Sequence, residues 1–205
     1  MRFVLFPFLA VLYTVGIRRQ YTMPRKMIFA LTFVIVSWLL FDRKVYAVHS
    51  DAILRSIAET VLLMAGPLWL KLLEVYSEGL ELRYSHANLH CLIVGPICEE
   101  YLFRHLPASN FQVPPWMSAF TFSAVHFKRD EWPRTLVQMA FTFVFACWAN
   151  GVYARNGLGG VVISHALCNA IGFPNLEHFK VLPDWGKLLL VIVQLISWTL
   201  LWKSL

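Results

Sequence analysis

The stretch GPICEEYLFRH, residues 95–105, places two adjacent glutamates, Glu99 and Glu100, inside a long apolar run. Over the 205 residues of the chain, 58% are hydrophobic and 15% are charged, whereas soluble domains are about half apolar and a quarter charged. The mean hydropathy is +0.58. This composition predicts an integral membrane protein, in which a carboxylate pair needs a specific reason.

Apolar runs separated by polar or proline-containing connectors continue outward from this stretch in both directions. Because a spanning helix needs about 20 mainly apolar residues or somewhat fewer, the chain has room for at most about eight passes. We predict an all-α fold, a polytopic transmembrane bundle of about seven or eight helices forming one membrane domain over residues 1–205. The runs cover residues 3–17, 27–41, 52–70, 87–106, 115–127, 135–150, 158–172 and 187–202.

The net charge of +6 comes from Lys and Arg residues that fall between the apolar runs. There they set orientation in the membrane, so we expect no nucleic-acid partner. With eight crossings, one side of the membrane carries eleven cations, Arg18, Arg19, Arg25, Lys26, Lys71, Arg83, Lys128, Arg129, Arg134, Lys180 and Lys187. The other side carries Arg2, Arg43, Lys44, Arg155 and Lys203, so the first side is predicted to be cytosolic.

A charge inside the bilayer costs at least about 2.5–3.5 kcal/mol on insertion scales, so such residues usually face an interior cavity. Arg104 follows Glu100 at the favourable i, i+4 spacing, which predicts an ion pair on one helix face. Glu99 points about 100° away around the helix and has no cation at its own i+4 position. Pro96 is expected to start or kink this helix, which would place both carboxylates near its positive dipole end.

Two further clusters lie in later apolar runs. In the first, Phe122 precedes His126 by four residues; in the second, His165 precedes Asn169 by four residues. The i, i+4 spacing puts each pair on one helix face. Alone, the first is typical of an interfacial histidine and the second of an interhelical hydrogen bond. Together with Glu99 they supply a base for water, a second group to hold that water, and donors for a developing oxyanion.

Other chemistries use neighbouring residues. A covalent nucleophile would be Ser123, Ser164, Cys98 or Cys168, and a zinc ion would be held by two histidines and a glutamate. The sequence has no HExxH, however, and the four cysteines, Cys91, Cys98, Cys147 and Cys168, lie in apolar runs at no metal-ligand spacing. We therefore read the cysteines as core residues and expect neither a disulfide framework nor a cofactor.

These residues carry a resemblance to a known family. Glu99-Glu100-Tyr-Leu-Phe-Arg104, Phe122-Ser-Ala-Val-His126 and His165-Ala-Leu-Cys-Asn169 resemble, in this order, the EExxxR, FxxxH and HxxxN motifs of the type II CAAX prenyl endopeptidases. The similar region runs from about residue 95 to residue 174, including Gly95-Pro96 and Gly172-Phe173-Pro174 at its ends.

The resemblance implies a metal-independent intramembrane glutamate protease of the endoplasmic reticulum, with its active site open to the cytosol. It would remove the last three residues of farnesylated or geranylgeranylated CaaX proteins such as small GTPases. By residue match, Glu99 would activate water with His126, and His165 and Asn169 would form the oxyanion hole. Glu100, Arg104 and Phe122 would support them.

Two alternatives belong to other classes. A transporter or proton-relay protein also uses intramembrane Glu and His residues, but it would favour broken helices at corresponding positions of two halves, and no such symmetry is visible. A non-proteolytic membrane scaffold of the same superfamily would keep the motif residues for structure.

Overall fold

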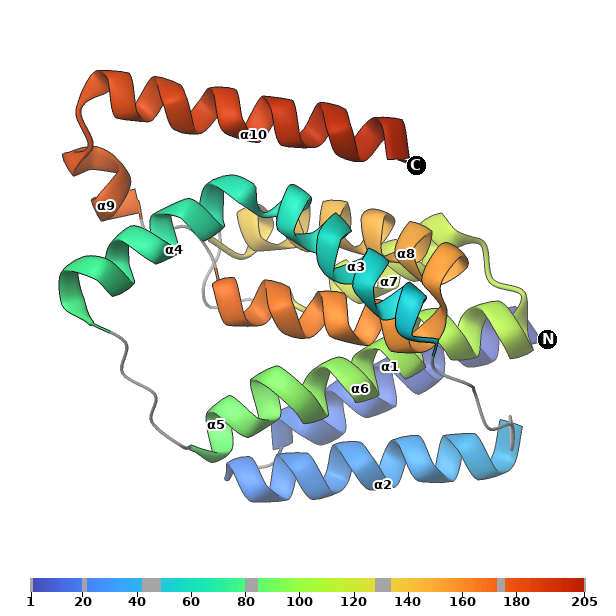
Figure 1. Ribbon diagram of the computed structural model, residues 1–205. Helices are drawn as coiled ribbons and strands as arrows, with labels where there is room; N and C mark the ends of the chain where they lie inside the picture. Colours follow the sequence, from blue (N-terminus) through green and yellow to red (C-terminus); the bar gives the residue numbers. More distant parts are fainter. Residues whose placement is uncertain are drawn as a thin grey trace.

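The computed structural model describes residues 2–19, 22–41, 49–79, 85–127, 134–172 and 176–204. Every regular element in these residues is helical, which confirms the predicted all-α class (Figure 1). The α-helices are α1 (Arg2–Arg19), α2 (Met23–Phe41), α3 (Ser50–Leu63), α4 (Ala65–Glu78), α5 (His86–Leu89), α6 (Gly95–Glu100), α7 (Pro115–Ala124), α8 (Arg134–Ile171), α9 (Leu176–Val181) and α10 (Asp184–Ser204). Three π-helical segments, η1 (His90–Val94), η2 (Tyr101–His105) and η3 (Pro107–Phe111), adjoin α6.

Each of the eight predicted apolar runs corresponds to helix. In the described ranges, three helices are long and apolar enough to cross a membrane: Met23–Phe41, Thr135–Ile171 and Asp184–Leu201. A bent pair, α3 and α4, would make a fourth. Large apolar side chains project outward from these helices, for example Leu40 at 68% exposure and Val144 at 66%, as lipid-facing residues do. The protein is therefore a membrane helix bundle.

Two groups of helices pack around the predicted motifs. Helices α1 and α2 lie side by side against the helix that contains α5 and α6, while α3 lies across α8 (Figure 1). Helix α10 runs along the outer side of α3 and α4. Phe6, Phe103 and Phe122, from three different elements, are almost completely buried in one core cluster. The continuous helix formed by α5, η1, α6 and η2, residues 86–105, carries Glu99, Glu100 and Arg104 and is called the motif helix below. It lies in the interior of the bundle.

The motif helix begins earlier than the sequence suggested. Ser85 is its N-cap, and its side-chain oxygen accepts a hydrogen bond from the backbone N–H of Asn88. The helix continues through η1, where Gly95 donates its N–H to the carbonyl of His90, five residues back. This wider turn accommodates Pro96, which has no N–H to donate, without ending the helix. The prediction that Pro96 starts the helix is therefore wrong, and the carboxylates lie too far along it to benefit from its N-terminal dipole.

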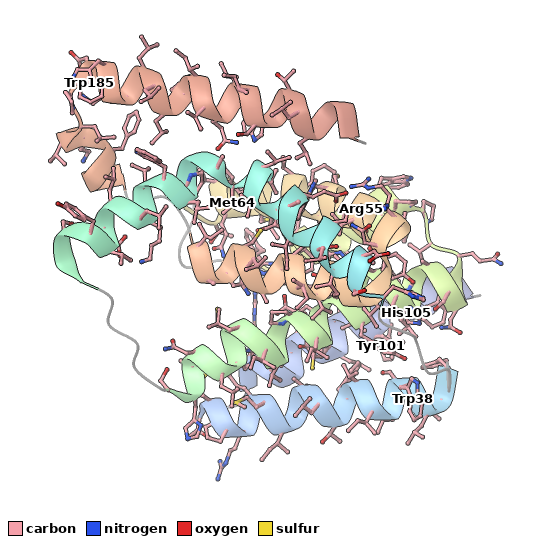
Figure 2. The ribbon with its side chains drawn as sticks, viewed as in Figure 1. Trp38, Arg55, Met64, Tyr101, His105 and Trp185 are labelled. Atoms are coloured by element: carbon pink, nitrogen blue, oxygen red, sulfur yellow. The ribbon has the colours of Figure 1, made fainter. Side chains whose placement is uncertain are left out.

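The predicted run 52–70 is two helices rather than one. Helices α3 and α4 meet at Met64 with an angle of 81° between them (Figure 2). Pro67 cannot donate a hydrogen bond to the carbonyl of Leu63, and this carbonyl accepts instead from the side chain of Gln194 on α10 at 3.0 Å. The same amide accepts from the N–H of Gly66 at 2.7 Å. A single polar side chain thus satisfies both backbone groups at the break.

The runs 135–150 and 158–172 were predicted as separate helices, and they are separated by a break within α8. Gly157 has φ 71° and ψ −172°, a conformation outside the helical region, and one that only glycine adopts readily. The break lets the second half of α8, which carries His165 and Asn169, take its own direction.

Replacing Gly157 by alanine is expected to lower the free energy of unfolding by about 1–3 kcal/mol, because the added Cβ forbids this backbone conformation. Gly186→Ala is the matched control. Gly186 is helical, and its added Cβ would meet Pro183 at an ordinary 3.5 Å, so stability should stay equal or rise. Thermal unfolding of the purified proteins in detergent measures the stability of both variants. A Gly157→Ala protein with the melting temperature of the original protein would contradict the expectation.

Five cations used above to predict orientation, Arg43, Lys44, Arg83, Lys128 and Arg129, lie outside the described residues, as do Phe173 and Pro174. Arg155 was counted as a loop residue, but it lies within α8 and forms an ion pair with Glu59. The assignment of the cytosolic side remains a prediction.

Candidate active site

Glu100 forms the centre of a buried polar cluster. The Nε atom of Arg104, one helical turn later, lies 3.1 Å from its Oε2, and both side chains have 0% exposure. The other carboxylate oxygen, Oε1, lies 2.6 Å from Nδ1 of His165 on α8. A carboxylate ion only accepts hydrogen bonds, so Nδ1 carries the proton. The predicted pairing of Glu100 with Arg104 is confirmed, and His165 is its second partner.

The aromatic ring of Phe122 packs against this cluster. The guanidinium carbon of Arg104 lies 4.0 Å from the centre of the Phe122 ring, within the range of a cation–π contact. Neither Nη atom of Arg104 makes a hydrogen bond to a described residue, and the Phe145 ring also lies near the guanidinium, with its centre 5.9 Å from the guanidinium carbon. The Phe122 ring packs against those of His126 and His165 at 5.0 and 6.1 Å. Phe122 therefore joins all three motifs.

Glu99 faces a different space from Glu100. Its side chain is 25% exposed, and its nearest described ionic partner is Nε2 of His165 at 3.9 Å. It lines a pocket of about 200 Å³ that His126 also lines. The remaining lining residues come mainly from α1: they are Tyr13, Thr14, Ile17, Arg18, Phe103, Val125 and Gln138. The structure thus brings Glu99 and His126 together in one accessible pocket.

The hydrogen bond of His126 fixes which of its nitrogens is free. Its Nδ1 lies 2.8 Å from the carbonyl oxygen of Phe122. A carbonyl can only accept, so Nδ1 carries the proton, and in the neutral ring Nε2 keeps its lone pair. The residues that line the pocket therefore include two hydrogen-bond acceptors, the Glu99 carboxylate and the His126 Nε2.

His165 and Asn169 are adjacent on α8 but do not line the pocket. The side-chain amide of Asn169 donates to the carbonyl of Cys91 in η1 at 2.8 Å. An amide has two N–H donors, so one remains for another acceptor. Nε2 of His165 lies 3.9 Å from the carboxylate of Glu99, which does line the pocket.

The candidate nucleophiles are placed less suitably. The hydroxyl of Ser123 donates to the carbonyl of Met139, and Ser164 accepts from Thr60. Cys98 is completely buried. Within the described ranges, no three His, Cys, Asp or Glu side chains are grouped so as to hold a metal ion. The geometry favours a water-activating carboxylate over a covalent nucleophile.

Sequence reasoning missed two features of the site. One is the α1 wall of the pocket, which no motif marks. The other is Glu59, a buried carboxylate that accepts from Arg155 at 2.9 Å and links α3 to α8. Glu59 lies in the run 52–70, where a carboxylate among apolar residues was a visible signal. Its neighbour Thr60 holds Ser164, next to His165.

The fold and the site define the class: an all-α membrane protein with a glutamate and a histidine facing one interior pocket. The model of the family described as type II CAAX prenyl endopeptidase, Rce1-like, matches residues 87–171. This match confirms the resemblance predicted from the three motifs, all of which lie inside it, and supports membership of the membrane CAAX-type protease superfamily. No curated protein and no solved structure matches the chain.

Proposed function

We propose that this protein is an intramembrane endopeptidase that removes the C-terminal tripeptide from prenylated CaaX proteins. The observation that carries the proposal is the shared pocket of Glu99 and His126, beside a second carboxylate, Glu100, whose charge is already matched by Arg104. An accessible, unmatched carboxylate next to a hydrogen-bonded histidine is suited to activate water. The catalytic motifs lie within residues 95–174 of a single membrane domain, residues 1–205.

In the first step, a water molecule donates its hydrogens to Glu99 and to Nε2 of His126. Glu99 takes one proton as the water oxygen attacks the carbonyl carbon of the prenylated cysteine. The new C–O bond leaves a negative charge on the carbonyl oxygen. By the residue match, an N–H at Nε2 of His165 and the second N–H of Asn169 are the donors that stabilise this charge.

In the second step, Glu99 returns the proton to the leaving nitrogen. The C–N bond breaks, giving a prenylated cysteine carboxylate and a free tripeptide. Glu100 takes no proton in this scheme. It fixes His165 through Nδ1 and is itself fixed by Arg104, so that the donor and the base keep their separation.

The membrane setting fits this substrate class. A farnesyl or geranylgeranyl chain partitions into lipid at about 0.8 kcal/mol per buried CH₂, while the peptide end is polar. A bundle with an outward apolar surface and an interior carboxylate pocket can accept both parts. We propose the endoplasmic reticulum membrane as the location, with the pocket open to the cytosol.

The direct test uses membranes that contain the protein and a farnesylated CaaX peptide, with and without a zinc chelator. Release of the terminal tripeptide, followed by mass spectrometry, is expected in both conditions. Chelator-sensitive release would contradict the water–carboxylate mechanism. The absence of release from folded protein would favour the scaffold or the transporter.

His126→Ala and His165→Ala are each expected to reduce tripeptide release by about 10²–10⁴-fold, the usual contribution of a proton-handling or oxyanion-stabilising group. His49→Ala is the matched control, since His49 is exposed and lies outside the pocket. Initial rates at equal membrane abundance measure the effect. Retention of more than a tenth of the rate in either site variant would remove that histidine from the mechanism.

A further inference from the structure

Arg18 gives the pocket a cationic end. Among the described residues that line the pocket, it is the only Lys or Arg, and Glu99 is the only carboxylate. The lining residues Tyr13, Thr14, Ile17 and Arg18 have the i, i+1, i+4, i+5 spacing of one helix face. The pocket therefore carries a negative side chain, Glu99 from α6, and a positive side chain, Arg18 from α1.

The guanidinium of Arg18 is held in place by the motif segment itself. Its Nη2 donates to the carbonyl of Val125 at 2.7 Å and to that of Phe127 at 2.8 Å. These two carbonyls flank His126. The two bonds use two of the five N–H donors of the side chain and leave three for a ligand. Arg18 is thus a preorganised cation beside one of the proposed catalytic groups.

The part of α1 that lines the pocket is comparable in length to the leaving peptide. The five residues from Tyr13 to Arg18 rise about 7.5 Å along the helix axis, and the arginine side chain extends further. Three extended residues span about 10 Å. If the scissile carbonyl lies between Glu99 and His126, the carboxylate at the end of the tripeptide can reach the Arg18 end of the pocket.

We infer that Arg18 forms a subsite for the free C-terminal carboxylate of the substrate, an inference that rests on the proposed function. A charge-assisted bond to this carboxylate sets the distance between the chain end and the cleaved bond. Arg18 would therefore be a specificity-determining residue, which selects the third peptide bond from the end. Internal sequences, which lack a terminal carboxylate, would bind without this contact.

The test compares two farnesylated peptides that differ only at the C-terminus, a free acid and a primary amide. The readout is the ratio of their kcat/KM values. In the original protein the acid is expected to be preferred by about tenfold to a hundredfold, the range for hydrogen bonds to charged groups. Arg18→Gln should reduce the ratio to near one, and Arg18→Lys should keep part of it. Arg25→Gln is the matched control, because Arg25 is exposed and outside the pocket, and it should leave the ratio unchanged.

Each other outcome has a distinct meaning. Equal cleavage of acid and amide by the original protein would overturn the subsite. An Arg18→Gln protein with both rates lowered in proportion would show that Arg18 only supports the end of α7 or binds a lipid phosphate, and would also overturn it. Cleavage of neither peptide by folded protein would contradict the proposed function itself.

Discussion

Glu99→Gln is expected to yield a protein that folds, inserts into the membrane and releases no measurable tripeptide. The substitution keeps the shape of the side chain but removes the acceptor that takes a proton from water, a contribution of about 10²–10⁴-fold. Glu99 has only a 3.9 Å contact with His165 as an ion pair among the described residues, so little stability should be lost. The measurement is the initial rate of tripeptide release at matched abundance, together with a melting temperature. Glu99→Ala should abolish release in the same way.

The control for this loss is Glu74→Gln. Glu74 is 26% exposed at its side chain, nearly the same as Glu99, but it pairs with Lys71 away from the pocket. Its replacement should leave the rate unchanged. Substantial release by a well-folded Glu99→Gln protein would refute the mechanism, because no other lining residue of the pocket is a carboxylate.

Arg104→Ala is expected to lower both stability and activity. Arg104 and Glu100 are completely buried, and removing one partner of a buried ion pair costs about 3–5 kcal/mol because the other charge is left uncompensated. The contact with the Phe122 ring is lost as well. Abundance in membranes and the melting temperature in detergent should both fall. This effect is the largest that we expect on stability.

A second variant distinguishes the destabilising effect of the uncompensated charge from that of the cavity left by the arginine side chain. Adding Glu100→Gln to Arg104→Ala removes the uncompensated carboxylate, so part of the lost stability should return, whereas a cavity effect would persist. Lys71→Ala, which breaks a partly exposed pair with Glu74, should cost no more than about 1 kcal/mol. Equal abundance of Arg104→Ala and the original protein would mean that His165 alone balances Glu100.

Local spacing predicted the parts of the site that one helix supplies. The i, i+4 rule correctly paired Glu100 with Arg104, because the two residues lie about one turn apart on the same helix. It also separated Glu99 from that pair. That His126 and Glu99 belong to one site could be predicted only from the motif resemblance. The residue spacing alone does not indicate that α7 packs near the motif helix.

Other features depended on long-range contacts or on backbone detail. The wide turn before Pro96 depends on the hydrogen bond from the Gly95 N–H to the carbonyl five residues back rather than four. The hydropathy pattern does not predict this change of hydrogen-bond partner. The bend at Met64 needs both Pro67 and a partner 131 residues from Leu63 in sequence. The α1 wall of the pocket was missed for the same reason: apolar patterning predicts a helix, but it does not identify the face that meets the motif residues.

The amide of Gln194 has a consequence for biosynthesis. At about 5–20 residues per second, a ribosome needs about 7–26 seconds to pass from Leu63 to Gln194. During that interval the carbonyl of Leu63 and the N–H of Gly66 lack the partner that later satisfies them, and an unsatisfied backbone group in hydrocarbon costs several kcal/mol. Helix α3 therefore reaches its final position late. Because Thr60 on α3 donates a hydrogen bond to Ser164, next to His165, we expect the segment that carries His165 to reach its final position only after α10 has entered the membrane.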